Sequence, residues 1–581
     1  MKKLSLLLAA ASLSLAANAE LKTYNLTEGQ SINSVIPYAD MPTLDSLKVT
    51  GTMQQSDLWF INGLCRQFAV LEYVDLSEVT GFTEIPASVF SEVATLKTVK
   101  LPSSITKVGD NAFAKMAALE TLTMPDGVVE IGAQAFLEDS LMTGLTLPSK
   151  LEYVGDAAFM GCKAVGPKLD IPASVTRIGL GAFTYLQGVK ELTVAEGNKE
   201  YKALGNVLYT ADGKALLSCA GGFVGALDVA DGTEQIQANA FAGAEGVTEV
   251  SLPASVTEIG DYAFDFMFGL GQVNVDADNA VYASKDGVLF DKQMQTLIIY
   301  PQGAKATSYA TPESVTEIAT AAFANNQHLV DVTLNEGIVT LGDYAFNDSP
   351  ALQTVTLPST LKDMGASTFT YCTALQDITI PSGVAYVPDY AFGECAALSD
   401  VTLQSGVQEI GVASFIGCTA LEGITLPSTL KLIYNGAFQR SGLKEIDVPE
   451  GVTALDINTF SYSTNLKNVT LPSTLTSVGG DSFDGTAPEK VVCNATVPPM
   501  ADYAFQFADL SASELVVPKG TEDAYKAAAG WKDFFKVSTG IQSVNTPAAV
   551  EKSKAIYGID GTRLSTMRRG LNIVNGKKVR K

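Results

Sequence analysis

The side chains that most often perform catalysis are scarce in this chain. Its 581 residues include one histidine, His328, so a Ser-His-Asp arrangement would depend on that residue alone. His328 follows Gln327 in a polar predicted loop, where a solvated side chain is the ordinary explanation. The sequence contains no C-x-x-C, H-E-x-x-H, P-loop or EF-hand motif and no G-x-G-x-x-G after a predicted strand. It therefore predicts no catalytic residues, no metal ligands and no cofactor.

Acidic side chains are abundant, and they leave one hydrolytic chemistry open. Paired carboxylates hydrolyse glycosides, but nothing in the spacing of the 63 Asp and Glu residues selects a pair. Acids at outward strand positions explain the same residues without chemistry. Against 39 Lys and Arg residues they give a net charge of −24, which also favours solubility. This negative field disfavours nucleic acid and anionic membranes as main partners.

Two sets of side chains are candidates for binding. Threonines stand at the outward position before the last apolar residue of many predicted strands, among them Thr356, Thr379, Thr402 and Thr425. They predict a threonine ladder along a sheet, although β-propensity alone also explains them. Tyrosines precede an Ala-Phe pair at Tyr262, Tyr344, Tyr390 and Tyr503. They could form exposed aromatic platforms for sugars or proteins, and partial burial in the core is the alternative.

A repeat positions both sets. Phenylalanines in the pattern x-A-F or a close variant recur at 90, 113, 136, 159, 183, 241, 264, 323, 346, 369, 392, 415, 438, 460, 483 and 505. Most intervals are 22–24 residues, and the two long ones of 58 and 59 equal one repeat plus an insertion of 35 or 36. No single unit can bury its own apolar face, whereas stacked coils bury a continuous one. The sequence therefore predicts a repeat solenoid.

One unit, Leu352 to Ala374, shows the expected anatomy of a coil. Its sequence is LQTVTLPSTLKDMGASTFTYCTA, which begins with a short strand that Pro358 ends. A helical or 3₁₀ turn then carries Phe369 into the core. Glycine stands four residues before the phenylalanine in nine units, as at Gly365, and indicates either a positive φ or a close backbone approach. The fold class is mostly β, with short strands and irregular turns.

The recurring motif L-x-x-V-x-L-P-x-S-V-x-x-I-G-x-x-A-F-x-x-C resembles the BspA-like leucine-rich repeat family of bacterial surface proteins. Leu252 to Gly260, LPASVTEIG, is close to that pattern, and the resemblance covers roughly Leu47 to Val537. It implies a leucine-rich-repeat solenoid with an extracellular binding or adhesion role, often towards host proteins. It carries over no catalytic residues.

The N-terminus has the pattern of a secretory signal peptide, residues 1–19. Lys2 and Lys3 precede an apolar segment, and Ala17-Asn18-Ala19 forms a cleavage site before Glu20. The apolar segment is too short to span a membrane, and no other segment approaches eighteen consecutive apolar residues. We therefore expect export, no transmembrane segment, and a location outside the cell or at the bacterial cell surface.

The remaining domain boundaries follow from breaks in the repeat. Residues 20–80 are expected to form an N-terminal cap and first coil, 81–510 the solenoid, 511–539 a C-terminal cap and 540–553 a linker. The cap is expected to close the core with Trp531, Phe534 and Phe535. Two matched insertions, near 196–222 and 275–303, predict β-hairpins, the first with an Asp-Gly turn. They could mark a binding face or be a variant coil standard in such repeats.

Export makes the seven cysteines candidates for disulfides. Cys162, Cys372, Cys395 and Cys418 each follow a repeat phenylalanine by three residues, which is typical of small buried side chains in a ladder. Free buried thiols are therefore expected. Pairing between adjacent coils, Cys372 with Cys395 or Cys395 with Cys418, would require bonding geometry.

The C-terminal segment 554–581 is predicted to be a short basic β tail. Between Glu551 and Lys581 there are nine basic residues against two acids. The segments Ala555–Leu564 and Arg569–Val579 resemble the type IX secretion C-terminal sorting signal. That resemblance implies passage through outer-membrane export machinery and attachment or release at the surface. A small β tail that packs on the solenoid or binds an anionic surface polymer is the alternative.

Together these features predict a non-enzymatic extracellular binding protein or adhesin. Its solenoid surface would engage host or cell-surface macromolecules, with protein favoured as the partner. A structural component of the cell envelope and a cell-surface glycan-binding protein are the alternatives.

Overall fold

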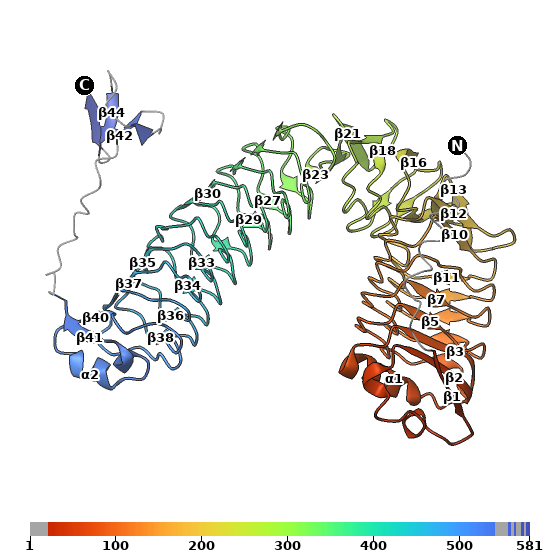
Figure 1. Cartoon of the computed structure of the whole chain (residues 1–581). Helices are drawn as coiled ribbons and strands as arrows, with labels where there is room; N and C mark the ends of the chain where they lie inside the picture. The colour runs from red at the N-terminus through yellow and green to blue at the C-terminus, as the bar shows by residue number, and fades with distance from the viewer. Residues whose placement is uncertain (1–20, 541–555, 559–562, 565–570, 575–576, 581) are drawn as a thin grey trace, which may run out of the picture.

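The computed structural model describes residues 21–540, 556–558, 563–564, 571–574 and 577–580. The predicted signal peptide, with its cleavage site at Ala17, Ala19 and Glu20, lies outside these residues, as does nearly all of the predicted linker. The described chain is a repeat solenoid, as the sequence predicts. It forms an arch whose bend lies in the segment that carries the insertions (Figure 1).

An N-terminal cap closes the first end of the core. It contains β1 (Lys22–Leu26), η1 (Ile32–Ser34), η2 (Met41–Thr43) and β2 (Ser46–Thr52), followed by α1 (Asp57–Phe68). Helix α1 buries Leu58 and Ile61 completely. It ends at Ala69, whose φ of 52° is left-handed and whose N–H donates to the Cys65 carbonyl. Strand β3 (Tyr73–Thr80) pairs in parallel with β2 and begins the coils.

Most coils contribute one strand to a long-strand sheet and one two-residue strand to a short-strand sheet, and the coils at Gly144 and Thr425 join the long strands only by single bridges. The sheets of the first kind continue with β5 (Thr98–Lys100), β7 (Thr121–Thr123), β10 (Lys168–Ile171), β12 (Glu191–Val194), β16 (Gly225–Asp228), β18 (Val247–Leu252), β20 (Gln272–Val275), β24 (Ser308–Ala310), β26 (Asp331–Thr333), β28 (Thr354–Thr356), β30 (Asp377–Ile380), β32 (Asp400–Leu403), β35 (Glu445–Asp447), β37 (Asn468–Leu471), β39 (Lys490–Cys493) and β40 (Glu514–Val517).

The short strands pair in parallel with one another and form a second set of sheets. They are β4 (Glu84–Ile85), β6 (Lys107–Val108), β8 (Glu130–Ile131), β9 (Tyr153–Val154), β11 (Arg177–Ile178), β17 (Gln235–Ile236), β19 (Glu258–Ile259), β25 (Glu317–Ile318), β27 (Thr340–Leu341), β29 (Asp363–Met364), β31 (Tyr386–Val387), β33 (Glu409–Ile410), β34 (Leu432–Ile433), β36 (Ala454–Leu455) and β38 (Ser477–Val478). Because strand side chains alternate between faces, every second residue is buried and the others face solvent.

The repeat phenylalanines stack in the core, held by a ladder of turns. The N–H groups of Ser88, Phe90 and Glu92 each donate to a carbonyl of the following coil at 2.8 Å. Ser88 and Glu92 have left-handed φ values of 57° and 60°, and residues two before and two after the later phenylalanines repeat this geometry. The turns close through i→i−3 hydrogen bonds, as from Ala112 N–H, and no helix occurs between Ala69 and Thr521. The helical or 3₁₀ turn that the sequence predicts at each repeat phenylalanine is thus a single hydrogen-bonded turn and not a helix.

The repeated glycine is explained by a close approach between coils, one of the two predicted reasons. A Cβ atom on Gly155 would lie 2.4 Å from the backbone nitrogen of Ala133 in the preceding coil. Gly155 is not among the residues with positive φ. At Gly365 the corresponding distance is 2.3 Å, to the nitrogen of Asp343. At these two glycines a side chain would therefore have to displace the backbone of the preceding coil.

Each insertion forms three antiparallel strands and interrupts the stack of coils. These are β13 (Tyr201–Leu204), β14 (Val207–Thr210) and β15 (Ala215–Cys219) in the first, and β21 (Tyr282–Lys285), β22 (Val288–Asp291) and β23 (Thr296–Ile299) in the second. Strands β15 and β23 then pair in parallel with short strands β17 and β25, so each occupies the place of a coil strand. The hydrophobic core divides into three clusters at these positions.

A C-terminal cap closes the other end of the core. It contains α2 (Glu522–Ala527), η3 (Trp531–Asp533) and β41 (Lys536–Thr539). Trp531 is fully buried and its Nε1–H donates to the Pro499 carbonyl at 2.8 Å. Phe534 is buried, but Phe535 is 73% exposed, so the expectation that it closes the core is wrong. Consecutive aromatic residues on an extended chain point to opposite sides, and only Phe534 points inward.

The tail contains β42 (Ile556–Gly558), β43 (Arg563–Leu564), β44 (Leu571–Val574) and β45 (Lys577–Arg580). They form a small antiparallel sheet in the order β43-β42-β44-β45.

Candidate functional site

The predicted threonine ladder lies on the outer face of the long-strand sheet β24-β26-β28-β30-β32. Thr379 pairs with Thr402, and Thr402 forms a bridge to Thr425 in the next coil. Thr356 holds the same position in β28, two residues after Thr354, which pairs with Asp377. All four threonines are exposed. The strand spacing of about 4.8 Å sets their distance from one coil to the next.

A column of acids runs beside the threonines. Asp331 pairs with Thr354, Thr354 with Asp377, and Asp377 with Asp400, each two residues before a threonine of the ladder. The three carboxylates are exposed. None of the ion pairs among the described residues involves them. We call Asp331, Asp377, Asp400 and the four threonines the acidic strand face.

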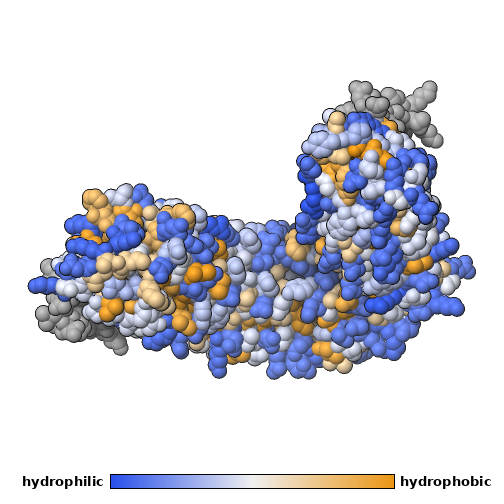
Figure 2. Space-filling model, turned by 90° about the horizontal axis from the view of Figure 1, so that it is seen from below, coloured by the Kyte–Doolittle hydropathy of each residue, from blue (hydrophilic) through white to orange (hydrophobic). Residues whose placement is uncertain are grey.

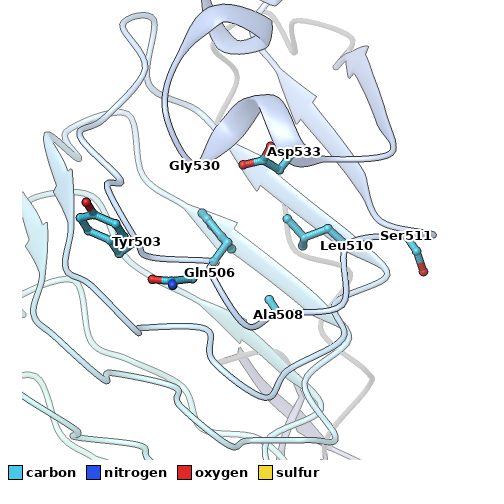
Figure 3. Close-up of a pocket in the computed structure, with 8 residues that line it drawn as sticks. Tyr503, Gln506, Ala508, Leu510, Ser511, Gly530 and Asp533 are labelled. Carbon is cyan, nitrogen blue, oxygen red and sulfur yellow. The ribbon is translucent and has the colours of Figure 1, made fainter.

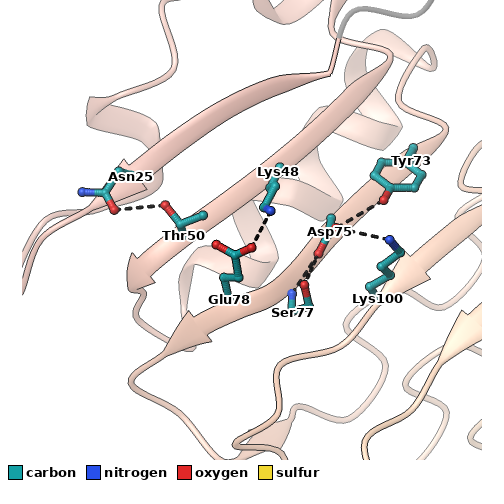
Figure 4. Close-up of polar contacts among 8 residues, drawn as sticks. All are labelled: Asn25, Lys48, Thr50, Tyr73, Asp75, Ser77, Glu78 and Lys100. Carbon is teal, nitrogen blue, oxygen red and sulfur yellow. Dashed lines mark hydrogen bonds and ion pairs between the residues drawn. The ribbon is translucent and has the colours of Figure 1, made fainter.

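The long-strand sheet of the first coils has a different charge pattern. Lys48 lies 2.6 Å from Glu78, and Lys100 lies 3.4 Å from Asp75, which also accepts a hydrogen bond from Tyr73 (Figure 4). Here each acid has a basic neighbour in the adjacent strand, so the charges cancel locally. The unpaired acids therefore concentrate negative charge on the second half of the solenoid.

The acidic strand face ends at a depression of about 580 Å³. Its lining includes Asp400, Thr402, Thr425, Glu445 and Asp447. It lies where the sheet that ends at β32 gives way to the one that begins at β35, with only the Thr402–Thr425 bridge joining the intervening coil. The depression adds two exposed carboxylates to the same face.

The candidate tyrosines lie in the turns and not on the long strands. Tyr262, Tyr344 and Tyr390 are 45%, 41% and 45% exposed, and their φ values of 56°, 59° and 55° are left-handed. Each ring is thus partly packed and partly available to solvent. Tyr262 and Tyr344 line one small cavity together, whereas Tyr390 lies further along the solenoid. The structure brings two of the three together and separates them from the threonines.

That cavity adjoins a larger one at the second insertion, where coils on either side meet across β23, and the two share Tyr262, Asp265 and Ala321 in their linings. The larger space has a volume of about 470 Å³, and its lining includes Tyr262, Phe264, Asp265, Gln302 and Asp343. Burial raises the pKa of Asp265, which accepts a 2.8 Å hydrogen bond from Asn325 Nδ2. We call the two adjoining spaces together the joint pocket. Sequence reasoning missed Gln302, because the insertion has no repeat position from which to judge it.

Another depression lies between the last coil and the C-terminal cap. Its volume is about 510 Å³, with Tyr503, Gln506 and Leu510 on the coil side and Gly530 and Asp533 on the cap side (Figure 3). Across the molecular face seen from below, the surface is mostly hydrophilic and apolar residues form small separate patches (Figure 2).

The histidine and the possible metal ligands are the remaining candidates for chemistry. His328 Nε2 lies 2.8 Å from Lys305 Nζ, which gives it a basic neighbour and not a carboxylate. Among the described residues no group of three or more His, Cys, Asp or Glu side chains has metal-binding geometry. No helix in the described part of the chain is long and apolar enough to cross a membrane.

The cysteines are free and buried. The Sγ atoms of Cys372, Cys395 and Cys418 each lie 3.0–3.1 Å from the carbonyl oxygen of the phenylalanine one coil earlier, to which the thiol donates. Ser349 makes the same bond at 2.9 Å to Phe323. At this position a cysteine or serine can donate to the preceding coil, and a buried apolar residue such as Val93 or Met116 takes the same place elsewhere, so the spacing of the cysteines is explained without disulfides.

Comparison with known proteins identifies the repeat. The family described as BspA type leucine rich repeat region matches in six copies, over residues 67–200, 224–295, 299–415 and 385–511. No curated protein matches the chain.

Several solved structures are similar in fold. A leucine rich cell surface protein from Faecalibacterium prausnitzii is 24% identical over 61% of this chain and 83% of its own, with a TM-score of 0.38. A leucine-rich repeat protein from Bacteroides ovatus is 19% identical over 76% and 88%, with a TM-score of 0.28. The pneumococcal vaccine antigen PcpA is 21% identical over 80% and 85%, with a TM-score of 0.27.

Proposed function

This chain belongs to the BspA-type leucine-rich repeat family, and on that premise we propose that it is a non-enzymatic binding protein of the bacterial exterior. The family match over most of the chain carries the proposal. A long exposed strand surface among the described residues supports it. The partner we propose is an extracellular protein, of the host or of another cell surface.

The acidic strand face is the proposed contact surface. Asp331, Asp377 and Asp400 repeat along parallel strands with no basic neighbour, and Glu445 and Asp447 extend the negative charge. Complementary charge steers association and selects the partner, so the bound protein should present a basic surface. The threonines beside the acids offer hydroxyl groups that both donate and accept hydrogen bonds.

Binding can be measured with the purified mature chain and a panel of host extracellular matrix proteins. Saturable binding to a basic member is expected, and it should weaken as salt screens the charges. The triple variant Asp331→Asn, Asp377→Asn, Asp400→Asn should lower the affinity at least tenfold. Removing the same charge at exposed Glu120, Glu152 and Glu200 by substitution with Gln is the control and should leave binding unchanged.

A structural role in the envelope is the outcome that competes with partner binding. If no matrix protein or surface protein binds saturably, the solenoid acts as a structural component and the binding proposal is wrong. If binding occurs but both triple variants behave alike, the chain is a binding protein whose contact surface lies elsewhere.

The proposed route to the surface uses both ends of the chain. The signal peptide, residues 1–19, would direct export, with cleavage between Ala19 and Glu20. The basic tail, residues 554–581, would then engage outer-membrane export machinery and hold or release the protein at the surface. The nine basic residues between Glu551 and Lys581 support an anionic docking partner for this tail.

Surface proteolysis of intact cells tests this route. Cells that express the full chain should lose it to added protease, whereas cells expressing a chain without residues 551–581 should retain it inside. Equal digestion of the two chains would contradict the sorting role of the tail and leave the signal peptide as the only targeting segment.

A further inference from the structure

The joint pocket lies where the hydrogen-bond ladder between coils is broken. The N–H groups of Asn239 and Phe241 donate to carbonyls of the following coil, at 3.1 Å to Asp261 and 2.9 Å to Ala263. In the following coil, the equivalent N–H groups of Tyr262 and Phe264 have no hydrogen-bond partner among the described residues. Strand β19 is likewise the last strand of its sheet, and β23 belongs to the next one.

The pocket also contains an acceptor without a donor. Gln302 is 6% exposed and its Oε1 has no hydrogen-bond partner. The side chain of Gln302 lies beside the carboxyl of Asp265, and both line the larger space. A buried acceptor left without a partner costs free energy, so its retention in a cavity wall indicates a group that is missing. The joint pocket thus combines orphaned donors with an orphaned acceptor.

The walls of the pocket are aromatic and acidic. Tyr262, Ala321 and Tyr344 hold the same turn position in three coils and together line the smaller cavity. Asp261, Glu317 and Asp343 line the larger space, and neither space is lined by Lys or Arg. The Tyr262 ring is half-exposed, so one side of it is free to pack against a ligand.

We propose that the joint pocket binds a neutral carbohydrate of one or two sugar rings. Each ring hydroxyl can accept from the Tyr262 or Phe264 N–H while it donates to Gln302 Oε1 or to a carboxylate. The C–H face of the sugar packs on Tyr262 or Tyr344. The volume of about 470 Å³ lies in the range of small-molecule sites.

Other ligand classes fit the same groups less well. An anionic sugar or a phosphate would meet four carboxyl groups, those of Asp261, Asp265, Glu317 and Asp343, with no basic residue in the lining. A Lys or Arg side chain could pair with the carboxylates, but it has no acceptor for the two orphaned N–H groups. The proposal goes beyond the protein binding proposed above and does not depend on it, since the acidic strand face shares none of these residues.

The test begins with the mature chain on an array of neutral and sialylated oligosaccharides, followed by calorimetric titration with the neutral oligosaccharide that binds best. Saturable binding of a neutral glycan is expected. Tyr262→Ala and Gln302→Leu should each lower the affinity at least tenfold, because a site built to hydrogen-bond a hydroxyl discriminates strongly when that bond is lost. Tyr262→Phe keeps the aromatic face and should bind within about threefold of the parent.

Tyr462→Ala is the matched control. Tyr462 is exposed and has a left-handed φ of 58°, close to the 56° of Tyr262, but it lies outside the joint pocket. It should leave sugar binding unchanged, and melting temperatures report whether each variant is folded. If Tyr262→Ala fails to fold, Tyr344→Ala on another coil takes its place.

Three results would overturn the proposal: no neutral glycan binds, only sialylated glycans bind, or the pocket variants bind like the parent. Loss of sugar binding with matrix-protein binding intact would separate this site from the acidic strand face. Failure of matrix-protein binding alone would leave the sugar proposal standing.

Discussion

Asp139 stands in the buried column of residues three after the repeat phenylalanines, where cysteines and serines donate a hydrogen bond to the preceding coil. Cys162, one coil later, donates from Sγ to the Phe136 carbonyl at 3.0 Å. Asp139 Oδ1 accepts from Met116 N–H at 2.8 Å, but Oδ2 has no partner. Burial raises the pKa of Asp139 to about 8. The folded protein therefore holds Asp139 as a neutral acid at neutral pH.

Asp139 makes stability fall as pH rises. Its pKa in the unfolded chain is close to the ordinary 3.8, so from about pH 4 to about pH 8 only the unfolded chain releases the proton. Over that window the group should reduce the free energy of unfolding by about 1.4 kcal/mol per pH unit. Asp139→Asn keeps an acceptor and adds a permanent donor, so it should remove this contribution.

Urea denaturation of parent and variant at several pH values measures the difference. The advantage of Asp139→Asn should be small at about pH 4 and grow towards about pH 8. Cys162, the titratable neighbour in the column, has its own pKa raised by burial and stays neutral in this range. A constant difference between the two proteins would show that Asp139 is ionised in the fold.

Residue spacing predicted the candidate side chains that follow the repeat and missed those that do not. Thr379 and Thr402 are placed by the period of 23 residues, which fixes both their strand and their face. Gln302 lies in an insertion, and its orphaned oxygen depends on how two coils meet across that insertion. No local pattern encodes this contact.

At the scale of the coil, the repeated glycine sets how closely neighbours stack. The space that a Cβ atom would need at Gly155 is occupied by backbone, which cannot move without shifting the whole coil. Gly144 is exposed, and no atom lies within 4 Å of the place that a Cβ atom would take there. A methyl group added at Gly155 would meet backbone, whereas one added at Gly144 would meet open space.

Gly155→Ala should therefore destabilise the protein and Gly144→Ala should not. Overpacking against backbone costs about 1–3 kcal/mol or more, whereas Ala at an open site with ordinary φ changes stability by less than about 1 kcal/mol. Thermal unfolding followed by circular dichroism compares the two variants. Equal melting temperatures would mean that the coils can move apart to admit a side chain.

The strands could be predicted from the sequence, but the turns could not. Strand periodicity and proline ends are local signals. The turns instead place residues such as Tyr371 and Glu394 at φ values of 62° and 59°, which single residues other than Gly, Asn and Asp avoid. Hydrogen bonds to the next coil, such as Glu394 N–H to the Ile416 carbonyl at 2.7 Å, compensate for this strain.

At the scale of the whole molecule, the two insertions divide the solenoid. The stack of phenylalanines is continuous from Phe90 to Phe183 and resumes fully at Phe323, where Tyr300 occupies the preceding place. The three core clusters separate at the same positions. In a solenoid stability is a sum of coil and interface contributions, so weak interfaces become boundaries between cooperative units.

We expect thermal unfolding in more than one transition. Trp531→Ala removes a buried side chain of the C-terminal cluster and should lower the transition of that cluster alone, with a loss of about 3–5 kcal/mol. Phe113→Ala should lower the N-terminal transition in the same way. Differential scanning calorimetry separates the two effects. A single transition that both variants lower would show that the insertions transmit cooperativity.

The difference in charge pattern between the first coils and the acidic strand face could not be predicted from composition. The net charge of −24 gives no position, whereas the strand register shows that Lys48 and Lys100 neutralise acids in the first coils and that Asp377 and Asp400 have no such neighbours. The register between strands of neighbouring coils is fixed only when the coils stack, so composition does not contain it. The bend of the arch is likewise set by how the insertions pack (Figure 1).

Carboxyl footprinting of the protein bound to the best-binding member of the matrix panel is the most direct test of binding through the acidic strand face. Carbodiimide labelling followed by mass spectrometry reports the accessibility of each exposed acid. Asp331, Asp377 and Asp400 should be protected by the partner, while Glu120 and Glu152 are labelled equally with and without it. Unchanged labelling of the three aspartates in a saturated complex would contradict the proposed contact surface.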